Sequence, residues 1–237
     1  MRDHRCLPKA RREMIWHLVN SGRCDAAFNM ALDEALLETV SRLGSPVLRF
    51  YGWTQPAATF GYFQHFAEIE SNTPLRPLIR RPTGGGLVPH DADWTYSLAF
   101  PLGHEWHSLR AEESYRRVHE WIQQSFTHLD VHADLAPCCK KTAPGQCFVG
   151  YEKSDLLWHG KKIAGAAQRR NKLGLLIQGS VQPPPLSLQR NAWENAMRQT
   201  VPATAKWKDL IVVGELLELT HGLVTQKYSQ PLYNQKR

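Results

Sequence analysis

Apolar residues recur at helical spacing in two stretches of the chain. The first stretch covers residues 26–41, with Asp25 as a candidate N-cap and Asp33 and Glu34 mostly outside its apolar face. The second covers residues 108–127, with Ser108 as a candidate cap. The two apolar faces consist of Phe28, Leu32, Ala35, Leu36 and Val40, and of Tyr115, Val118, Ile122 and Phe126. These patterns predict two helices that pack on a core.

Short apolar runs separated by turn residues predict a sheet. The predicted strands cover residues 14–19, 46–51, 57–63, 78–81, 93–100, 155–158, 162–168 and 173–181. Ser21-Gly22 and residues 159–161 are predicted turns. The three prolines at 183–185 end the sheet, and the segments after them, residues 187–200 and 206–223, are predicted to be helical.

Three consecutive glycines, Gly84, Gly85 and Gly86, follow Arg80 and Arg81 between two predicted strands. Glycine permits positive φ angles and lets a ligand lie directly on backbone N–H groups, whereas three in a row weaken a helix or a strand. The segment is therefore either a backbone cradle for a carbonyl, carboxylate or phosphate group or a flexible surface loop. No predicted helix follows the glycines directly, which argues against a Walker or Rossmann phosphate loop.

Composition narrows the class of protein. A chain of 237 residues with 42% hydrophobic content suits one large domain, or one domain with a small appendage. No apolar run approaches the roughly 18 residues that span a membrane, and the N-terminus lacks the apolar segment of a secretory signal. Five cysteines at irregular spacing, without a CxxC pair, indicate neither a disulfide framework nor a zinc site. We therefore expect a cytoplasmic protein with no bound metal.

The net charge of +7 permits an acidic partner. Much of the excess positive charge lies in residues 2–12 and in the tail, residues 227–237. Aromatic residues are not interleaved with Lys and Arg as in proteins that bind single strands. Nucleic acid is therefore an unlikely partner, and an acidic protein is favoured.

Four polar side chains are candidates for chemistry. Cys147 is a possible thiolate nucleophile, although a lone cysteine is more often a small buried hydrophobe. Lys162 begins a strand of small residues and could reach an acyl oxygen or a phosphate; the adjacent Lys161 must face the other way. His90 and Asp91 could form a base with its orienting partner, but the favoured interpretation is that they fix the loop by hydrogen bonds.

Seven segments, in order, resemble the lipoate/octanoate protein ligase and transferase family, which is related to biotin protein ligases. They are FNMALDEAL at 28–36, LRFYGW at 48–53, FGYFQ at 60–64, RRPTGGGLVPHD at 80–91, TYS at 95–97, QCF at 146–148 and GKKIAGAAQ at 160–168. Each motif alone is weak, whereas the ordered set is specific. The resemblance covers roughly residues 14 to 182.

This resemblance implies an α/β (α+β) fold with a mixed, largely antiparallel sheet flanked by helices, as in biotin/lipoate-ligase catalytic domains. A catalytic core would cover residues 14–185, preceded by the basic segment 1–13. Residues 186–237 would form a helical C-terminal extension with a basic tail, packed on the same domain. The glycine loop would line an acyl pocket, and the implied substrate-binding residues are Arg80, Arg81, Gly84, Gly85, Gly86, His90, Gly165 and Ala166.

Two chemistries occur in this family. A ligase activates lipoate with ATP and Mg²⁺ as an acyl-adenylate, whereas an octanoyltransferase moves the acyl group through its own cysteine without a cofactor. The Cys147-Phe148 pair before the lysine strand is similar to the cysteine-dependent branch, which implies Cys147 and Lys162 as catalytic residues. Lys162 would act as a base or would position the thioester carbonyl. An amidotransferase between lipoyl proteins would use the same cysteine, and a non-catalytic acyl-binding module is the alternative from another class.

The implied partners are octanoyl-acyl carrier protein as donor and, as acceptors, lipoyl domains of 2-oxoacid dehydrogenases and the glycine-cleavage H protein. The short segment after the sheet favours a transferase over a ligase, because many ligases carry a larger C-terminal accessory domain. Two residues depart from the transferase pattern. Gly86 is typical of ligases, and Pro89 replaces a residue that is usually apolar or aromatic.

Overall fold

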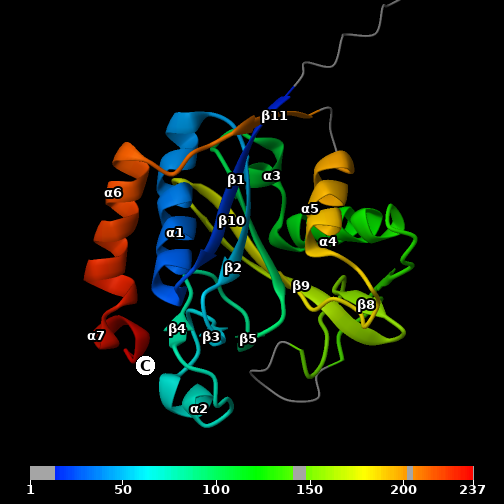
Figure 1. The fold of residues 1–237 in the computed structure, drawn as a ribbon, viewed down its shortest axis with the longest axis horizontal. Helices are drawn as coiled ribbons and strands as arrows, with labels where there is room; N and C mark the ends of the chain where they lie inside the picture. Colours follow the sequence, from blue (N-terminus) through cyan, green and yellow to red (C-terminus); the bar gives the residue numbers. More distant parts are fainter. Residues whose placement is uncertain (1–13, 141–147, 202–204, 237) are drawn as a thin grey trace, which may run out of the picture.

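The computed structural model describes residues 14–140, 148–201 and 205–236. A large sheet crosses the molecule, with α1 (Ala26–Leu43) and α6 (Gly214–Leu223) on one side. Helices α4 (Ala111–Thr127) and α5 (Arg190–Gln199) lie on the other side (Figure 1). This is the layered arrangement expected when each helix buries one apolar face against a sheet.

The large sheet has eight strands in the order β11-β1-β2-β6-β10-β9-β8-β7. In this order they cover Ala205–Asp209, Met14–Cys24, Val47–Trp53, Trp94–Phe100, Gly174–Val181, Lys161–Asn171, Leu156–Trp158 and Asp134–Leu135. Among the described strands of this sheet, β1 pairs in parallel with its two neighbours, β11 and β2. The other neighbouring strands pair antiparallel. The predicted fold class, a mixed and largely antiparallel sheet flanked by helices, is confirmed.

The face of the sheet under α4 and α5 is apolar. Alternate strand residues such as Phe50, Tyr96 and Leu98 pack there with Trp121 of α4 and Trp193 of α5. A short helix, α3 (Glu105–Ser108), completes this layer through Trp106. Because the three largest fully buried rings, those of Trp16, Trp121 and Trp193, meet on this side, it forms the main hydrophobic core.

Helix α1 covers part of the opposite face, and Asp25 caps it by accepting a hydrogen bond of 2.8 Å from the N–H of Phe28. The predicted helix and its cap are confirmed. The placement of Asp33 and Glu34 outside the buried face was wrong, because both are less than 9% exposed. Each carboxylate has a basic partner, Arg49 and Lys227 respectively, and pairing is what allows charged side chains to be buried.

A second sheet of three strands lies beside the first. Its central strand, β3 (Ala57–Phe60), pairs in parallel with β4 (Leu78–Arg80) and antiparallel with β5 (Val88–His90). Helix α2 (Phe66–Glu70) connects β3 to the segment before β4. The glycines connect the two outer strands, so the loop lies across one end of this small sheet. The sequence did not predict β5 or α2, which are too short for a clear periodic pattern.

Some predicted boundaries were wrong. Strand β1 continues through Ser21-Gly22, where its pairing with β2 shifts register. Ser108 belongs to α3, and α4 begins after Arg110. Residues 205–209 form β11 rather than a helix, because they pair with the edge strand β1. The sequence contains no local signal for such pairing, which depends on a strand almost two hundred residues away.

The chain ends in α6, a π-helical turn over Val224–Tyr228 and α7 (Pro231–Asn234). Asn234 accepts a hydrogen bond of 2.9 Å from the backbone N–H of Arg80, so this segment contacts the small sheet. Among the described residues, no helix has both the length and the apolar character required to cross a bilayer.

Candidate active site

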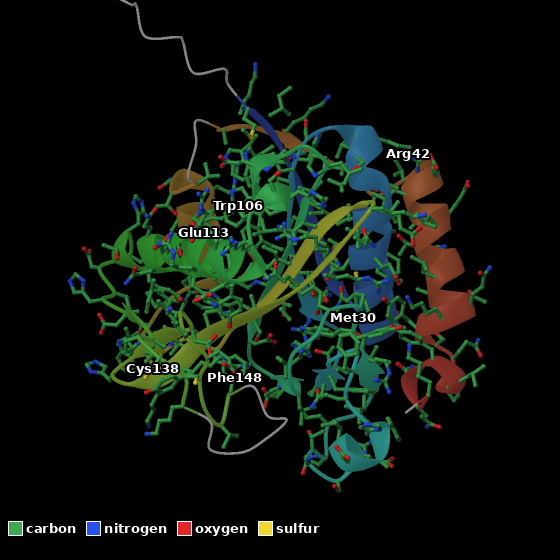
Figure 2. All side chains as sticks on the ribbon, turned by 180° about the vertical axis from the view of Figure 1, so that it is seen from behind. Met30, Arg42, Trp106, Glu113, Cys138 and Phe148 are labelled. Atoms are coloured by element: carbon green, nitrogen blue, oxygen red, sulfur yellow. The ribbon has the colours of Figure 1, made fainter. Side chains whose placement is uncertain are left out.

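A pocket with about 450 Å³ of empty space lies between the small sheet and the large one. It is lined by Met30, Tyr51, Thr59, Arg81, Val88, His90, Thr95, Phe148, Lys162, Gly165, Ala166, Ala167, Gln178, Gly179 and Ser180. Two of these residues are labelled in Figure 2: Met30 on α1, and Phe148 in the lower part of the molecule near Cys138.

The glycine loop is held by Arg81. Its guanidinium donates hydrogen bonds of 2.6 Å to the carbonyl oxygen of Gly84 and 2.8 Å to that of Gly86. Gly85 has a φ of +85°, and a Cβ there would lie 2.7 Å from an Arg81 nitrogen. Among the described residues, Arg81 lines the pocket whereas Gly84, Gly85 and Gly86 do not. Gly85 is exposed, and a Cβ there would lie 3.5 Å from that of Ala167, so the loop lies next to the pocket wall.

Arg80 points away from this pocket. Its guanidinium donates to the carbonyl oxygens of Tyr62 and Gln64 and to those of Tyr233 and Asn234 in the C-terminal segment. The two predicted arginines therefore differ in position. Arg81 lies at the pocket, and Arg80 connects β4 to the end of the chain.

His90 lies at the inner end of the pocket, stacked on Trp53 with ring centres 3.9 Å apart. Its Nδ1 is 2.8 Å from Asp93, and its Nε2 is 2.8 Å from the Thr59 hydroxyl. The partner proposed from sequence was wrong, because Asp91 is exposed and Asp93 is the carboxylate beside the ring. The hydrogen bonds that fix this ring agree with the favoured interpretation of His90 as a loop-fixing residue.

Gln178 connects the pocket to a buried ion pair. Its amide nitrogen donates to Asp33 at 2.7 Å, and Asp33 lies 2.6 Å from Arg49. The Tyr51 hydroxyl also donates to Asp33, at 3.0 Å. Burial, followed by the negative charge of Asp33, holds the pKa of Tyr51 well above its usual value, so the phenol stays a neutral donor. This network fixes one wall of the pocket.

Lys162 is directed into the pocket by an irregularity in its strand. The pairing of β8 with β9 shifts at Leu156/Leu157, which leaves Ile163 as an extra residue in β9. Side chains alternate along a strand, so this bulge places Lys162 on the same face as Gly165. A Cβ on Gly165 would lie 2.7 Å from the Lys162 ammonium, so the lysine occupies the space that glycine leaves. As predicted, only one of the two lysines points inward, since Lys161 is exposed.

Asp155 is the partner of Lys162. Its carboxylate lies 2.7 Å from the ammonium, and the two side chains are 0% and 6% exposed. The Tyr115 hydroxyl donates to the same carboxylate, and His119 of α4 lies 3.9 Å from it. This cluster fixes the position of the Lys162 ammonium at the pocket.

Comparison with known proteins identifies the family. Residues 25–182 match the lipoyl protein ligase A/B catalytic domain. This match covers more than half of the chain. The chain belongs to the lipoyl protein ligase A/B family. The resemblance noted in the sequence is therefore confirmed.

Named relatives of this family member include two octanoyltransferases. The LipM proteins of Anoxybacillus flavithermus and Bacillus subtilis are each 36% identical to it, over 184 and 179 residues. These alignments cover 70% of this chain, but 65% and 64% of the relatives. The chain thus matches slightly less than two thirds of the relatives' own length.

Solved lipoyl protein ligase structures share the fold. A Thermoplasma acidophilum protein with bound lipoic acid has a TM-score of 0.77, with 21% identity, 95% of this chain and 100% of that chain covered. Lipoate-protein ligase A bound with ATP has a TM-score of 0.75 and 21% identity, and the alignment covers 94% of this chain and 98% of that chain. At such identities the likeness establishes the fold alone.

The predicted nucleophile, Cys147, lies outside the described residues. Phe148 follows it directly in the chain, lines the pocket and has its ring centre 5.2 Å from the Lys162 ammonium. Gly165 and Ala166 also line the pocket. Among the described residues, no group of three His, Cys, Asp or Glu side chains is arranged to hold a metal ion.

The sequence did not reveal the residues that pair with the predicted site residues of this family member. Asp155 was noticed only as the start of a strand, and Asp93 only as part of another. Tyr115 was assigned to an apolar stripe, and its hydroxyl was overlooked. The one available signal was a polar residue inside an otherwise apolar segment, which is too common to identify a site.

Proposed function

We propose that the protein is an octanoyltransferase. It takes an octanoyl group from acyl carrier protein onto Cys147 and passes it to a lysine of a lipoyl domain or of the glycine-cleavage H protein. The observation that carries this proposal is the position of Phe148, next in sequence to Cys147, in the same pocket as Lys162. The octanoyltransferase names of relatives at 36% identity support the same reaction.

The pocket suits an unbranched acyl chain. Ala166 and Ala167 have small side chains and leave space beside β9, whereas the space at Gly165 holds the Lys162 side chain. The polar groups at the inner end have partners in the protein. The hydroxyls of Thr95 and Ser180 both donate to Asp93, at 3.1 and 2.7 Å. Because these donors already have acceptors, an alkyl chain can enter without leaving them unpaired.

The proposed reaction has two steps. First, the Cys147 sulfur bonds to the octanoyl carbonyl carbon, the carbon–sulfur bond to the carrier breaks, and the carrier thiol takes the proton lost by Cys147. Second, a neutral acceptor amine attacks the same carbon, the bond to Cys147 breaks, and the surplus proton of the amine returns to that sulfur. Exchange between thioesters is nearly isoenergetic and amide formation is downhill, so ATP and Mg²⁺ are not required.

Lys162 and the pocket walls have distinct roles in this proposal. Lys162 interacts with the reacting carbonyl oxygen, where negative charge develops. Arg81 holds the loop of Gly84, Gly85 and Gly86, and His90 closes the inner end. Arg80 supports the loop from outside the pocket. Residues 186–201 and 205–236 pack on the core as an extension of the same domain.

A three-way assay on an apo lipoyl domain tests the proposal. The donors are octanoyl-acyl carrier protein, octanoyl-H protein, and octanoate with ATP and Mg²⁺. We expect transfer from the carrier protein, together with a thioester adduct detected by mass spectrometry. Activity only with ATP would identify a ligase, activity only with octanoyl-H protein an amidotransferase, and no turnover with any donor a binding module.

The adduct is the sharpest part of this test. Cys147→Ser should abolish the thioester, whereas the matched Cys138→Ser variant, at an exposed position, should keep it. A thioester that persists in Cys147→Ser contradicts the assignment of the nucleophile.

A further inference from the structure

The Asp155 carboxylate accepts hydrogen bonds from three directions. Oδ2 lies 2.7 Å from the Lys162 ammonium and accepts a bond of 2.6 Å from the backbone N–H of Glu152. Oδ1 accepts from the Tyr115 hydroxyl of α4. The backbone amide and the ammonium can only donate, so Oδ2 of Asp155 acts as an acceptor for both. Its position is fixed from two separate elements of the fold.

His119 adds no charge to this cluster. Its Nδ1 lies 2.8 Å from the carbonyl oxygen of Tyr115, which only accepts, so Nδ1 carries the hydrogen. Complete burial lowers the pKa of His119 to about 4, so the ring is neutral near pH 7. Near neutral pH, the Asp155 carboxylate and the Lys162 ammonium therefore form a balanced pair of charges.

The ammonium has hydrogens left for a ligand. It carries three, and within the described part of the chain Asp155 is its hydrogen-bond acceptor. Lys162 also lines the pocket and lies 5.2 Å from the centre of the Phe148 ring. The space above Gly165 lets the side chain turn back toward Asp155. One side of the ammonium is thus bound to protein, and another faces the substrate pocket.

We propose that Asp155 is a positioning residue that holds Lys162 as a charged hydrogen-bond donor to the acyl carbonyl oxygen, with Tyr115 securing Asp155. This inference rests on the proposed function and decides between the two roles considered for Lys162. In both transfer steps Lys162 keeps its three hydrogens, and the protons move between sulfur and nitrogen as described above. Its contribution is electrostatic stabilisation of the charge on the carbonyl oxygen.

Double-variant kinetics test the coupling between the two residues. Loss of the donor in Lys162→Ala should lower kcat by roughly 100-fold or more, as for other oxyanion donors. Asp155→Asn should lower kcat by roughly 10- to 100-fold and change the KM for the octanoyl donor by less than about threefold, because the pocket wall is intact. The double variant should be no slower than Lys162→Ala. Effects that multiply would overturn the proposal.

Two further variants separate positioning from folding. Tyr115→Phe keeps the ring and removes only the hydroxyl, and we expect a smaller loss of kcat than in Asp155→Asn, with a melting temperature lowered only by the loss of one hydrogen bond. Lys153→Gln removes a cation from an exposed ion pair with Glu112 and should leave kcat unchanged. Loss of kcat in Lys153→Gln equal to that in Asp155→Asn would contradict a specific role for Asp155.

A measurement without turnover keeps this inference separate from the proposed function. Amine-directed acetylation, followed by peptide mass spectrometry, reports how reactive each lysine is. We expect Lys162 to react several-fold faster in Asp155→Asn than in the wild type, with Lys161 unchanged. If no donor supports transfer, the proposed function fails while this result still stands. An unchanged rate at Lys162 overturns the proposed ion-pair role.

Discussion

The Thr83 hydroxyl donates a hydrogen bond of 2.7 Å to Oε1 of Gln178. Thr83 precedes the three glycines, and Gln178 lies in β10, so this bond joins the loop to the large sheet. Both side chains are less than 9% exposed, which means that water cannot replace the bond. The pocket wall therefore depends on a contact between segments 95 residues apart in the chain.

Thr83→Val should weaken this contact while keeping the shape of the side chain. It leaves the Gln178 oxygen buried without its donor, at a cost of about 1–3 kcal/mol in the free energy of unfolding. Urea unfolding measures this loss, and the KM for the octanoyl donor should rise with it. Thr127→Val, at an exposed helix position, is the control. Equal stability in the two variants would contradict the role of the bond.

Asp33→Ala should be among the most destabilising substitutions in the protein. It leaves Arg49 buried at 0% exposure without its carboxylate, which typically costs about 3–5 kcal/mol. The matched control is Glu113→Ala, which breaks partly exposed ion pairs with Arg116 and Arg117 and should lower the free energy of unfolding far less. If denaturant unfolding shows equal losses of unfolding free energy in Asp33→Ala and Glu113→Ala, the buried ion pair contributes no more than an exposed one.

Gly165→Ala should lower activity more than stability. The new methyl group occupies the space of the Lys162 side chain, which is flexible enough to move but then loses its position beside Asp155. Displacement of about 1 Å at a reacting centre can reduce the rate by up to roughly 100-fold. Gly222→Ala, where nothing lies within 4 Å of a new Cβ, is the control for both rate and melting temperature. Full activity in Gly165→Ala would refute this packing argument.

His119 should make the protein less stable in mild acid. Burial lowers its pKa to about 4 from the usual 6.5, so the unfolded chain binds the proton more readily than the folded one. Neutral His119 contributes about 3 kcal/mol to the free energy of unfolding. This contribution is fully present above pH 6.5 and is lost as the pH falls toward 4. Unfolding free energies between pH 7 and 4 should decline less steeply in His119→Gln. His128→Gln should keep the wild-type slope.

The fold class and the long elements were predictable because their signals are local. The apolar spacing of residues 26–41 and the cap at Asp25 are properties of neighbouring residues. The short strand β5 and the edge strand β11 were missed, because both exist through pairing with distant partners. Buried Asp33 was misplaced for the same reason. Its partner, Arg49, lies on β2, and helix periodicity cannot show that the carboxylate has a partner.

The sequence by itself determined the family, the glycine loop and the candidate pair of Cys147 and Lys162. An ordered set of motifs specifies which residue type stands at each position and requires no knowledge of tertiary contacts. Only the tertiary structure decided where the Lys162 side chain points and which residue it contacts. One extra residue at Ile163 turns the lysine toward the pocket, and Gly165 leaves it room. Helix α4 then brings Tyr115 to Asp155, the partner of that lysine. The strand bulge and the ion pair both depend on contacts between residues that are not adjacent in the chain, so the neighbouring residues in the sequence do not reveal them.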